Sequence, residues 1–248
     1  YQDIYFNERR NKMLCVPAAI SRTKLNIKNI LLAAKCFSGC KNIKTISYNG
    51  GNYSHRIDGV FDNCPDVEEI SLTNVEVLPR LIDCQKLKKL NIDGEFDGSL
   101  NYSLIRNEEL KEVYINKSWE YHTINGAVFN KNHELIFYPP AKEDEKYVVP
   151  ENTLVINDGV FTSNPYLRTV VLPATFNLSK LKKEWHIDGD MDNGQSFIYH
   201  SCRGNDIEIR LEEVKASPSP KAKNVKHKGR KKKYEVKGII IGTYEQKS

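Results

Sequence analysis

The sequence predicts an α/β repeat solenoid, in which one short unit is stacked on itself and a parallel sheet runs along one face. Two observations support this prediction: an apolar pattern that recurs along most of the chain, and a regular interval between its copies. In each copy, Phe or Leu is followed three residues later by Cys or Asn, and three residues after that by an aliphatic residue, here called the anchor. Two further apolar residues stand at the third and fifth positions after the anchor. Such a repeat is typical of units that stack and bury one shared core.

The copies also predict the elements within each unit. The anchors of the first four copies are 24, 20 and 23 residues apart, which leaves room for one strand and a short return. Alternation of apolar and polar residues after each anchor predicts a half-buried strand. We expect the returns near Phe37 and Phe61 to be short helical, 3₁₀ or irregular segments, and the units to form a right-handed stack. The five copies are Phe37-Cys40-Ile43-Ile46-Tyr48, Phe61-Cys64-Val67-Ile70-Leu72, Leu81-Cys84-Leu87-Leu90-Ile92, Leu104-Asn107-Leu110-Val113-Ile115 and Phe161-Asn164-Leu167-Val170-Leu172.

A larger repetition relates residues 6–48 to residues 129–172. Both segments begin with Phe-Asn and carry Pro-Ala eleven residues further on, after an apolar run. We expect a β-hairpin excursion there, with a turn at Asn132-His133, and then a strand such as Tyr147–Pro150.

Several segments of the sequence match a known repeat. They are Val60–Cys64 with Val67–Leu72, Gly159–Phe161 with Leu167–Pro173, and Leu135–Pro139 leading to Tyr147–Pro150. Over roughly residues 4–211 the chain resembles the BspA-type leucine-rich repeat family, with Leu81 and Leu104 in place of the usual Phe. The resemblance implies a leucine-rich repeat fold and a non-catalytic adhesion module at a cell surface or in secreted form, with an intracellular location as the alternative.

The composition divides the chain into a long body and a basic end. We predict a solenoid over residues 1–212 with an irregular insertion at 177–205, a Pro/Lys-rich linker or loop at 213–233, and a strand at 234–248 as a candidate cap. Residues 215–248 hold 11 basic and 2 acidic side chains, a balance of +9, whereas the other 214 residues hold 26 basic and 30 acidic ones, a balance of −4. Binding to polyanions would therefore belong to the basic end alone.

The densest charge of the basic end lies in residues 226–233. With the solenoid as scaffold, these residues would hold a sulfated glycan, a nucleic acid or an anionic lipid by releasing counterions. A solvated loop is the competing interpretation, because no aromatic residues alternate with the charges to stack on bases. The candidates for polyanion binding are Lys226, Lys228, Arg230, Lys231, Lys232 and Lys233.

The six cysteines are interpreted as free thiols and not as a disulfide framework. Cys40, Cys64 and Cys84 occupy one position of the repeat, where Asn107 and Asn164 stand in later copies. A position that accepts both Cys and Asn needs a small group that meets backbone polar atoms in a turn. Stacked turns lie about 4.8 Å apart, so a bridge between neighbouring turns stays geometrically open.

No pattern in the sequence predicts catalysis, a cofactor or a metal site. Phosphate-binding glycine loops, His-Glu-x-x-His and a nucleophile elbow are all missing. His200, two residues before Cys202, is the nearest approach to thiol chemistry or to a metal site, and a structural role is the favoured interpretation. In the acidic segment that begins at Asp188, Asn193 stands at the sixth position and Tyr199 at the twelfth, where an EF-hand calcium loop requires Gly and Glu. No apolar run of 18 residues exists, so we expect no membrane span.

The outward residues of the predicted strands form the candidate binding site. The set is polar, mixed in charge and holds one aromatic ring, which favours a protein or carbohydrate ligand over an apolar small molecule. Trp119 and Trp185 fall in connecting segments and are interpreted as packing residues, with a platform for a sugar ring as the alternative. The outward set is Thr45, Ser47, Asn49, Glu69, Ser71, Thr73, Lys89, Asn91, Asp93, Glu112, Tyr114 and Asn116.

Overall fold

The computed structural model describes residues 4–50, 59–81, 84–96, 100, 104, 107–187 and 195–213. These residues belong to the first of two units of the chain, Tyr1–Glu213, and the second unit is Val214–Ser248. The predicted linker beyond Glu213, the predicted strand 234–248 and the acidic segment 188–194 lie outside the described residues.

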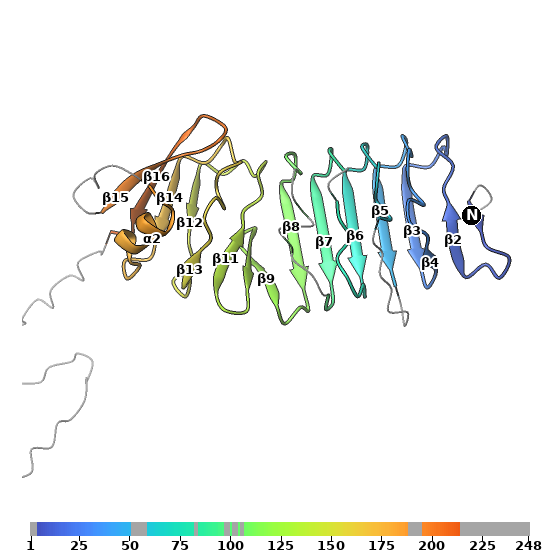
Figure 1. Cartoon of the computed structure of the whole chain (residues 1–248), viewed down its shortest axis with the longest axis horizontal. Coiled ribbons are helices and arrows are strands. Elements are labelled where there is room, and N and C mark those ends of the chain that lie inside the picture. Colours follow the sequence, from blue (N-terminus) through green and yellow to red (C-terminus); the bar gives the residue numbers. More distant parts are fainter. Residues whose placement is uncertain are drawn as a thin grey trace, which may run out of the picture. The chain divides into compact units, whose positions relative to one another are not determined.

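A five-stranded parallel sheet forms the N-terminal half of the solenoid, in the strand order β3-β5-β6-β7-β8 (Figure 1). Neighbouring strands pair residue for residue without a shift, so Ile46, Ile70 and Leu90 stand in one continuous row. The predicted repeat solenoid with a parallel sheet is confirmed. The strands are β3 (Lys24–Lys28), β5 (Thr45–Asn49), β6 (Glu69–Thr73), β7 (Lys89–Asp93) and β8 (Glu112–Asn116).

Alternation along each strand separates buried side chains from solvent-facing ones. In β5, β6 and β7 the second and fourth residues are at most 1% exposed, while the other three are partly exposed. Successive side chains of a strand point to opposite faces, so the pattern follows from the pleat. Because each buried aliphatic side chain contributes about 1.5–3 kcal/mol, stacking of the units is the main source of stability.

The returns near Phe37 and Phe61 are runs of β-turns. In the first of them the Ser38 N–H donates to the Lys35 carbonyl, an i to i+3 bond. Lys35 and Gly39 have φ angles of 59° and 74°, which lie outside the right-handed helical region. These returns are therefore irregular, which was one of the predicted possibilities. The helical or 3₁₀ alternative is not confirmed for them, because residues with positive φ angles interrupt the turns.

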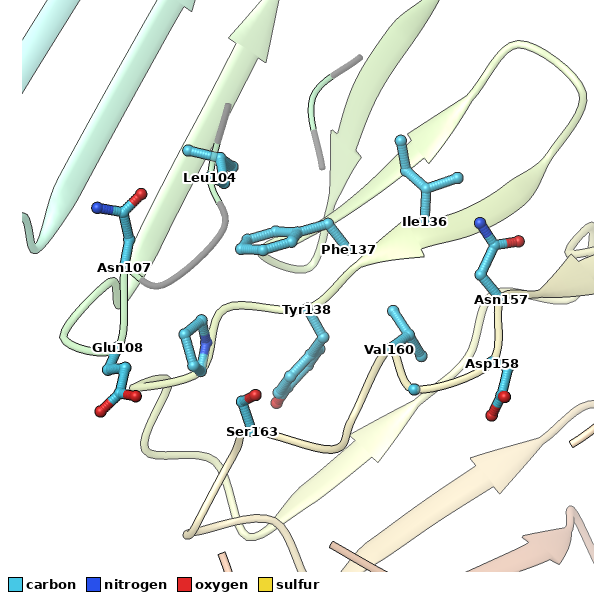
Figure 2. A pocket seen from close by; sticks show the side chains of 12 residues that line it. Leu104, Asn107, Glu108, Ile136, Phe137, Tyr138, Asn157, Asp158, Val160 and Ser163 are labelled. Carbon is cyan, nitrogen blue, oxygen red and sulfur yellow. The ribbon is translucent and has the colours of Figure 1, made fainter. Parts of the chain in front are cut away.

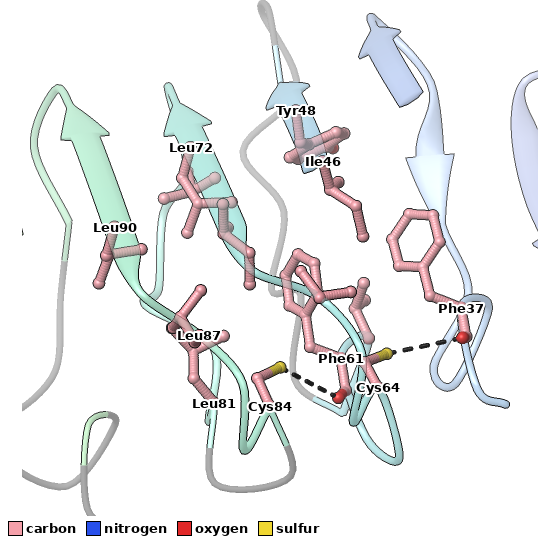
Figure 3. Close-up of a cluster of buried hydrophobic side chains, with 14 of the residues drawn as sticks. Phe37, Ile46, Tyr48, Phe61, Cys64, Leu72, Leu81, Cys84, Leu87 and Leu90 are labelled. Carbon is pink, nitrogen blue, oxygen red and sulfur yellow. Dashed lines mark hydrogen bonds between the residues drawn. The ribbon is translucent and has the colours of Figure 1, made fainter. Parts of the chain in front are cut away.

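The Cys or Asn position of each unit forms a hydrogen-bonded ladder through the interior. The Cys64 thiol donates to the Phe37 carbonyl at 3.5 Å and the Cys84 thiol to the Phe61 carbonyl at 3.8 Å (Figure 3). In the next unit the Asn107 side chain donates from Nδ2 to the Leu81 carbonyl at 2.8 Å. The expectation that this position meets backbone polar atoms of a turn is confirmed, and the turn is that of the preceding unit.

The position of each thiol predicts its reactivity. All six cysteines are free, with Cys15 and Cys202 exposed and the other four buried. Burial raises the pKa of Cys40 to about 12, so its reactive thiolate is scarce at pH 8. We expect iodoacetamide at pH 8 to alkylate two thiols of the folded protein and all six after unfolding, as counted by mass spectrometry. Alkylation of Cys64 or Cys84 in the folded protein would contradict the buried ladder.

The larger repetition appears as two blocks with the same pairing. In the first, β1 (Tyr5–Phe6) and β2 (Lys12–Cys15) are antiparallel, and β2 is parallel to β4 (Leu31–Leu32). The second block repeats this arrangement, and His133 has the positive φ angle of a tight turn, 60°. The predicted hairpin at Asn132-His133 is confirmed. Its strands are β10 (Ala127–Asn130), β11 (Glu134–Phe137) and β13 (Val155–Ile156), and β9 (Tyr121–Ile124) extends the sheet beside β10.

An antiparallel strand and a short helix complete the C-terminal sheet. The strands β12 (Lys146–Val148), β14 (Thr169–Leu172) and β16 (Asp206–Leu211) are parallel, whereas β15 (Ser196–His200) pairs antiparallel with β16. Helix α2 (Leu178–Glu184) begins after Asn177, whose side chain caps it by accepting from the N–H of Lys180. The segment predicted as an irregular insertion, 177–205, thus holds α2 and β15 in its described part. Outside α2, Leu100 and Leu104 are also helical.

Trp185, directly after α2, is a packing residue as predicted. It is 5% exposed, and its Nε1–H donates to the Ile156 carbonyl at 3.1 Å. Its ring lies edge-on to Phe197, with centroids 6.4 Å apart. The indole therefore joins α2 to the core of the C-terminal block, where its single donor is satisfied.

Candidate functional site

The outward side chains of the N-terminal sheet lie in three rows that cross its five strands. Because the strands pair without a shift, equivalent residues of successive units are direct neighbours. The first row is Lys24, Thr45, Glu69, Lys89 and Glu112; the middle row is Asn26, Ser47, Ser71, Asn91 and Tyr114; the third row is Lys28, Asn49, Thr73, Asp93 and Asn116.

The first row alternates in charge towards β8. Lys89 Nζ lies 3.2 Å from Glu112 Oε2 and 5.3 Å from the ring centroid of Tyr114. The hydrogen bond to Glu112, with the charge of that carboxylate, raises the pKa of Lys89, so its ammonium stays protonated. Exposed ion pairs of this kind add little to stability, so both partners are available for contacts with a ligand.

The middle row combines amide, hydroxyl and aromatic groups. Asn91 Nδ2 donates to Ser71 Oγ at 3.1 Å and, more weakly, to Glu69 Oε1 at 3.4 Å. Tyr114 ends the row with 43% of its surface exposed. Amides and hydroxyls both donate and accept hydrogen bonds, and a half-exposed ring adds apolar contact area. The row can therefore contact polar ligands in several orientations.

The third row is held by bonds between neighbouring turns. Lys117 Nζ lies 2.9 Å from Asp93 Oδ2, and Asn74 Nδ2 donates to Asn49 Oδ1 at 3.4 Å. These contacts involve residues just beyond the strands and orient the polar groups at this edge of the face. The edge thus presents a carboxylate and amides in fixed positions.

All predicted site residues of the strands lie on this one face, and their role in binding stays a prediction. Sequence reasoning missed Lys24, Asn26 and Lys28 of β3, which extend every row by one position. The alternation of buried Leu25 and Ile27 with these residues was the signal that could have found them. The predicted residues are Ser47, Asn49, Glu69, Ser71, Lys89, Asn91, Asp93, Glu112, Tyr114 and Asn116.

Trp119 is not the packing residue that the sequence predicts. Its side chain is 65% exposed after the end of β8, and its backbone N–H donates to Glu95 Oε1 at 2.8 Å. Lys131 Nζ lies 3.8 Å from the ring centroid, a cation–π contact. The interior beside this turn is filled by Phe96 and Tyr121, whose rings stack at 5.4 Å, so the indole remains outside.

His200 and Cys202 have separate partners. His200 Nδ1 lies 2.7 Å from Asp206 Oδ1 at an exposed position, and the Cys202 thiol donates to the Thr162 carbonyl at 3.1 Å. Among the described residues no three metal-binding side chains gather, and no helix is long and apolar enough to cross a bilayer. The polyanion candidates of residues 226–233 lie outside the part of the chain that the structure describes.

Comparisons with known proteins identify the repeat. A family model described as the BspA type leucine-rich repeat region matches residues 18–136 with six copies. The crystal structure of the pneumococcal vaccine antigen PcpA is similar at 20% identity and a TM-score of 0.35, over 68% of this chain and 48% of that chain. A leucine-rich repeat protein from Eubacterium ventriosum is similar at 11% identity and a TM-score of 0.35, over 66% of this chain and 62% of that chain.

The chain spans less than two thirds of the length of either of these solved structures. No curated protein matches it. The family match covers the same segment in which strands β3 to β8 stack in register. On this match and this stack of units, residues 18–136 of the chain form a BspA-type leucine-rich repeat region.

Proposed function

We propose that the chain is a non-catalytic module that binds a protein or a glycan on the face formed by the three rows of outward side chains. The observation that carries this proposal is the register: five strands set equivalent polar side chains next to one another without interruption. The continuous face of stacked repeats is the usual place where solenoids bind their ligands.

The chemistry of the face favours a wet contact. Charges of both signs stand beside amides and hydroxyls, and Tyr114 is the aromatic group among them. Polar groups of this kind share hydrogen bonds with a ligand either directly or through water. An apolar small molecule would gain little there, because it would strip water from these groups without replacing their bonds.

The setting we propose is adhesion, with the module displayed on a cell surface or secreted. The support for this setting is the resemblance of the repeats to the BspA type, and no single residue carries it. A ligand for such a module is a matrix or cell-surface protein, or the glycan attached to one.

Tyr114→Ala should weaken binding of the ligand at least about tenfold. Large aromatic side chains in an interface are often hot spots, whose truncation costs about 2 kcal/mol or more. Ligands would first be found on an array of matrix proteins and glycans. The dissociation constants of the wild type and the variant would then be measured by surface plasmon resonance.

Tyr166→Ala is the matched control. Tyr166 is 42% exposed against 43% for Tyr114, but it lies in the turn before β14, outside the three rows. Its variant should bind within about twofold of the wild type, because contacts away from a hot spot are nearly neutral. Equal binding by all three proteins would exclude the sheet face as the site.

The same array at two salt concentrations separates this proposal from its alternative, polyanion binding by the basic end. The balance of +9 in residues 215–248 favours that alternative. Contacts to six or more phosphate-like charges would weaken about 10³-fold between about 50 and 200 mM salt. Binding by the mixed-charge face should change little.

A further inference from the structure

A cavity of about 450 Å³ lies where the last turn of the N-terminal stack meets the second block (Figure 2). One wall comes from Leu104, Asn107 and Glu108, in the return that precedes β8. The opposite wall comes from the segment after β13, which includes Asp158 and Val160. Its volume is in the range of pockets that hold small organic ligands. None of the three rows on the sheet contributes to it.

The lining is apolar in the middle and acidic at two edges. In Figure 2, Glu108 and Asp158 lie on opposite sides, with Phe137 and Tyr138 between them. No Lys, Arg or His belongs to the described lining. Arg203 reaches Glu108 from outside, with Nη2 2.6 Å from Oε2, whereas Asp158 has no ion-pair partner among the described residues. The Asp158 side therefore offers an exposed negative charge beside an apolar surface.

Tyr138 brings a buried hydroxyl into the lining. The residue is 2% exposed, and its hydroxyl has no hydrogen-bond partner among the described residues. Edge contacts with Tyr147 and Phe161, at centroid distances of 5.0 and 5.4 Å, hold the ring. Burial raises the pKa of Tyr138, so the hydroxyl stays protonated and can donate or accept. An unpaired buried hydroxyl is unfavourable unless a ligand supplies the missing bond.

The side-chain oxygen of Asn107 is a second unpaired polar atom in the lining, and Asn164 of the same chain can be compared with it. Asn164, at the same ladder position of a later unit, accepts at Oδ1 from the N–H groups of Tyr166 and Leu167, both at 2.8 Å. Asn107 donates from Nδ2 as Asn164 does, but its Oδ1 has no partner among the described residues and the residue is 2% exposed. Only the Asn that borders the cavity leaves its oxygen unpaired, and a carbonyl oxygen requires a donor.

We propose that this cavity binds a small amphipathic amine. Its apolar body would lie against Phe137 and Val160, and its ammonium group would pair with the carboxylate of Asp158. Hydrogen-bond donors on the ligand would satisfy Asn107 Oδ1, and the Tyr138 hydroxyl would gain a partner. An ammonium group attracts a carboxylate through its opposite charge as well as through the hydrogen bond, whereas an alcohol offers the hydrogen bond alone, so the cavity should prefer amines to the corresponding alcohols.

Three probes that share a 4-hydroxyphenylethyl body test this preference: tyramine, the alcohol tyrosol, and the acid 3-(4-hydroxyphenyl)propionate. Titrations of the full chain would be followed by ligand-observed NMR. Tyramine should bind with a dissociation constant on the order of 1 mM, as its few atoms allow. Tyrosol should bind about threefold more weakly, because an ion pair at an exposed carboxylate adds only modestly to binding, and the acid should show no binding. Tyramine binding no tighter than tyrosol would overturn the proposal.

Variants locate the binding. Asp158→Asn, at an exposed position, should fold normally and abolish the preference for tyramine over tyrosol. Tyr138→Phe keeps the ring and should weaken both probes about threefold or more, since it removes one hydrogen bond. Glu8→Gln, at an exposed position between β1 and β2, is the control for general charge effects and should leave tyramine binding unchanged. An equal loss in Glu8→Gln and Asp158→Asn would place the amine on the surface and refute the cavity.

Discussion

Asn164→Ala should lower the free energy of unfolding by about 3–5 kcal/mol, because a buried donor or acceptor left unpaired costs about 1–3 kcal/mol. Asn164 is 1% exposed and uses both ends of its amide. Its Nδ2 donates to the Pro139 and Lys142 carbonyls at 3.1 and 2.8 Å, and its Oδ1 accepts from the N–H groups of Tyr166 and Leu167. Alanine at this position leaves three backbone groups without this partner, namely the Lys142 carbonyl and the N–H groups of Tyr166 and Leu167, whereas the Pro139 carbonyl keeps its bond from the Lys142 N–H at 3.2 Å.

Cys84→Ala, at the same ladder position, is the control for this prediction. The Cys84 thiol makes one weak bond, at 3.8 Å to the Phe61 carbonyl. Its removal should cost about 1–2 kcal/mol, mainly from the small cavity. Both values would be measured by urea unfolding monitored by circular dichroism. If Asn164→Ala costs no more than Cys84→Ala, hydrogen bonds of the ladder are not what holds neighbouring turns together.

Phe61→Ala should cost about 3–5 kcal/mol, the usual loss for a large side chain removed from a packed interior. Phe61 is 0% exposed, and its ring stacks on that of Phe37 with centroids 5.6 Å apart. Each unit contacts only its neighbours, so a void here weakens the packing on both sides. Thermal and urea unfolding of the full chain would measure the loss.

Phe61→Leu is the matched variant, because Leu81 and Leu104 occupy this position in two other units. A change that keeps an apolar side chain of similar size should cost less than about 1.5 kcal/mol. An equal loss for both variants would show that the aromatic stack, and not the filling of space, stabilises this turn.

The amino-acid pattern alone was enough to predict the stack of units and the face that it presents. Buried positions such as Ile70 and Leu90 recur at one place in each unit, and the outward residues alternate with them. Repeated units must bury the same side against one another, so a periodic sequence determines register without any knowledge of distant contacts. The duplicated hairpin could be predicted for the same reason, since its turn and its apolar run occur twice in the sequence.

The pattern predicted less about the irregular parts of each unit. The left-handed conformation of Lys35 decides the shape of its return, and nothing in a lysine side chain signals a positive φ angle. Trp119 was misplaced because exposure depends on what already fills the interior beside it, here Phe96 and Tyr121. Such outcomes depend on local packing and not on periodicity.

Periodicity along the chain was sufficient to predict the repeat, the parallel sheet and the polar rows on one face, because each depends on residues that recur every 20 to 24 positions. Tertiary structure alone decided the cavity, in which Asn107 and Tyr138 come together from different blocks, and the ion pair of Glu108 with Arg203 beside it. These groups meet only because the last unit of the N-terminal stack packs against the second block. No spacing along the chain encodes the contacts of such a junction.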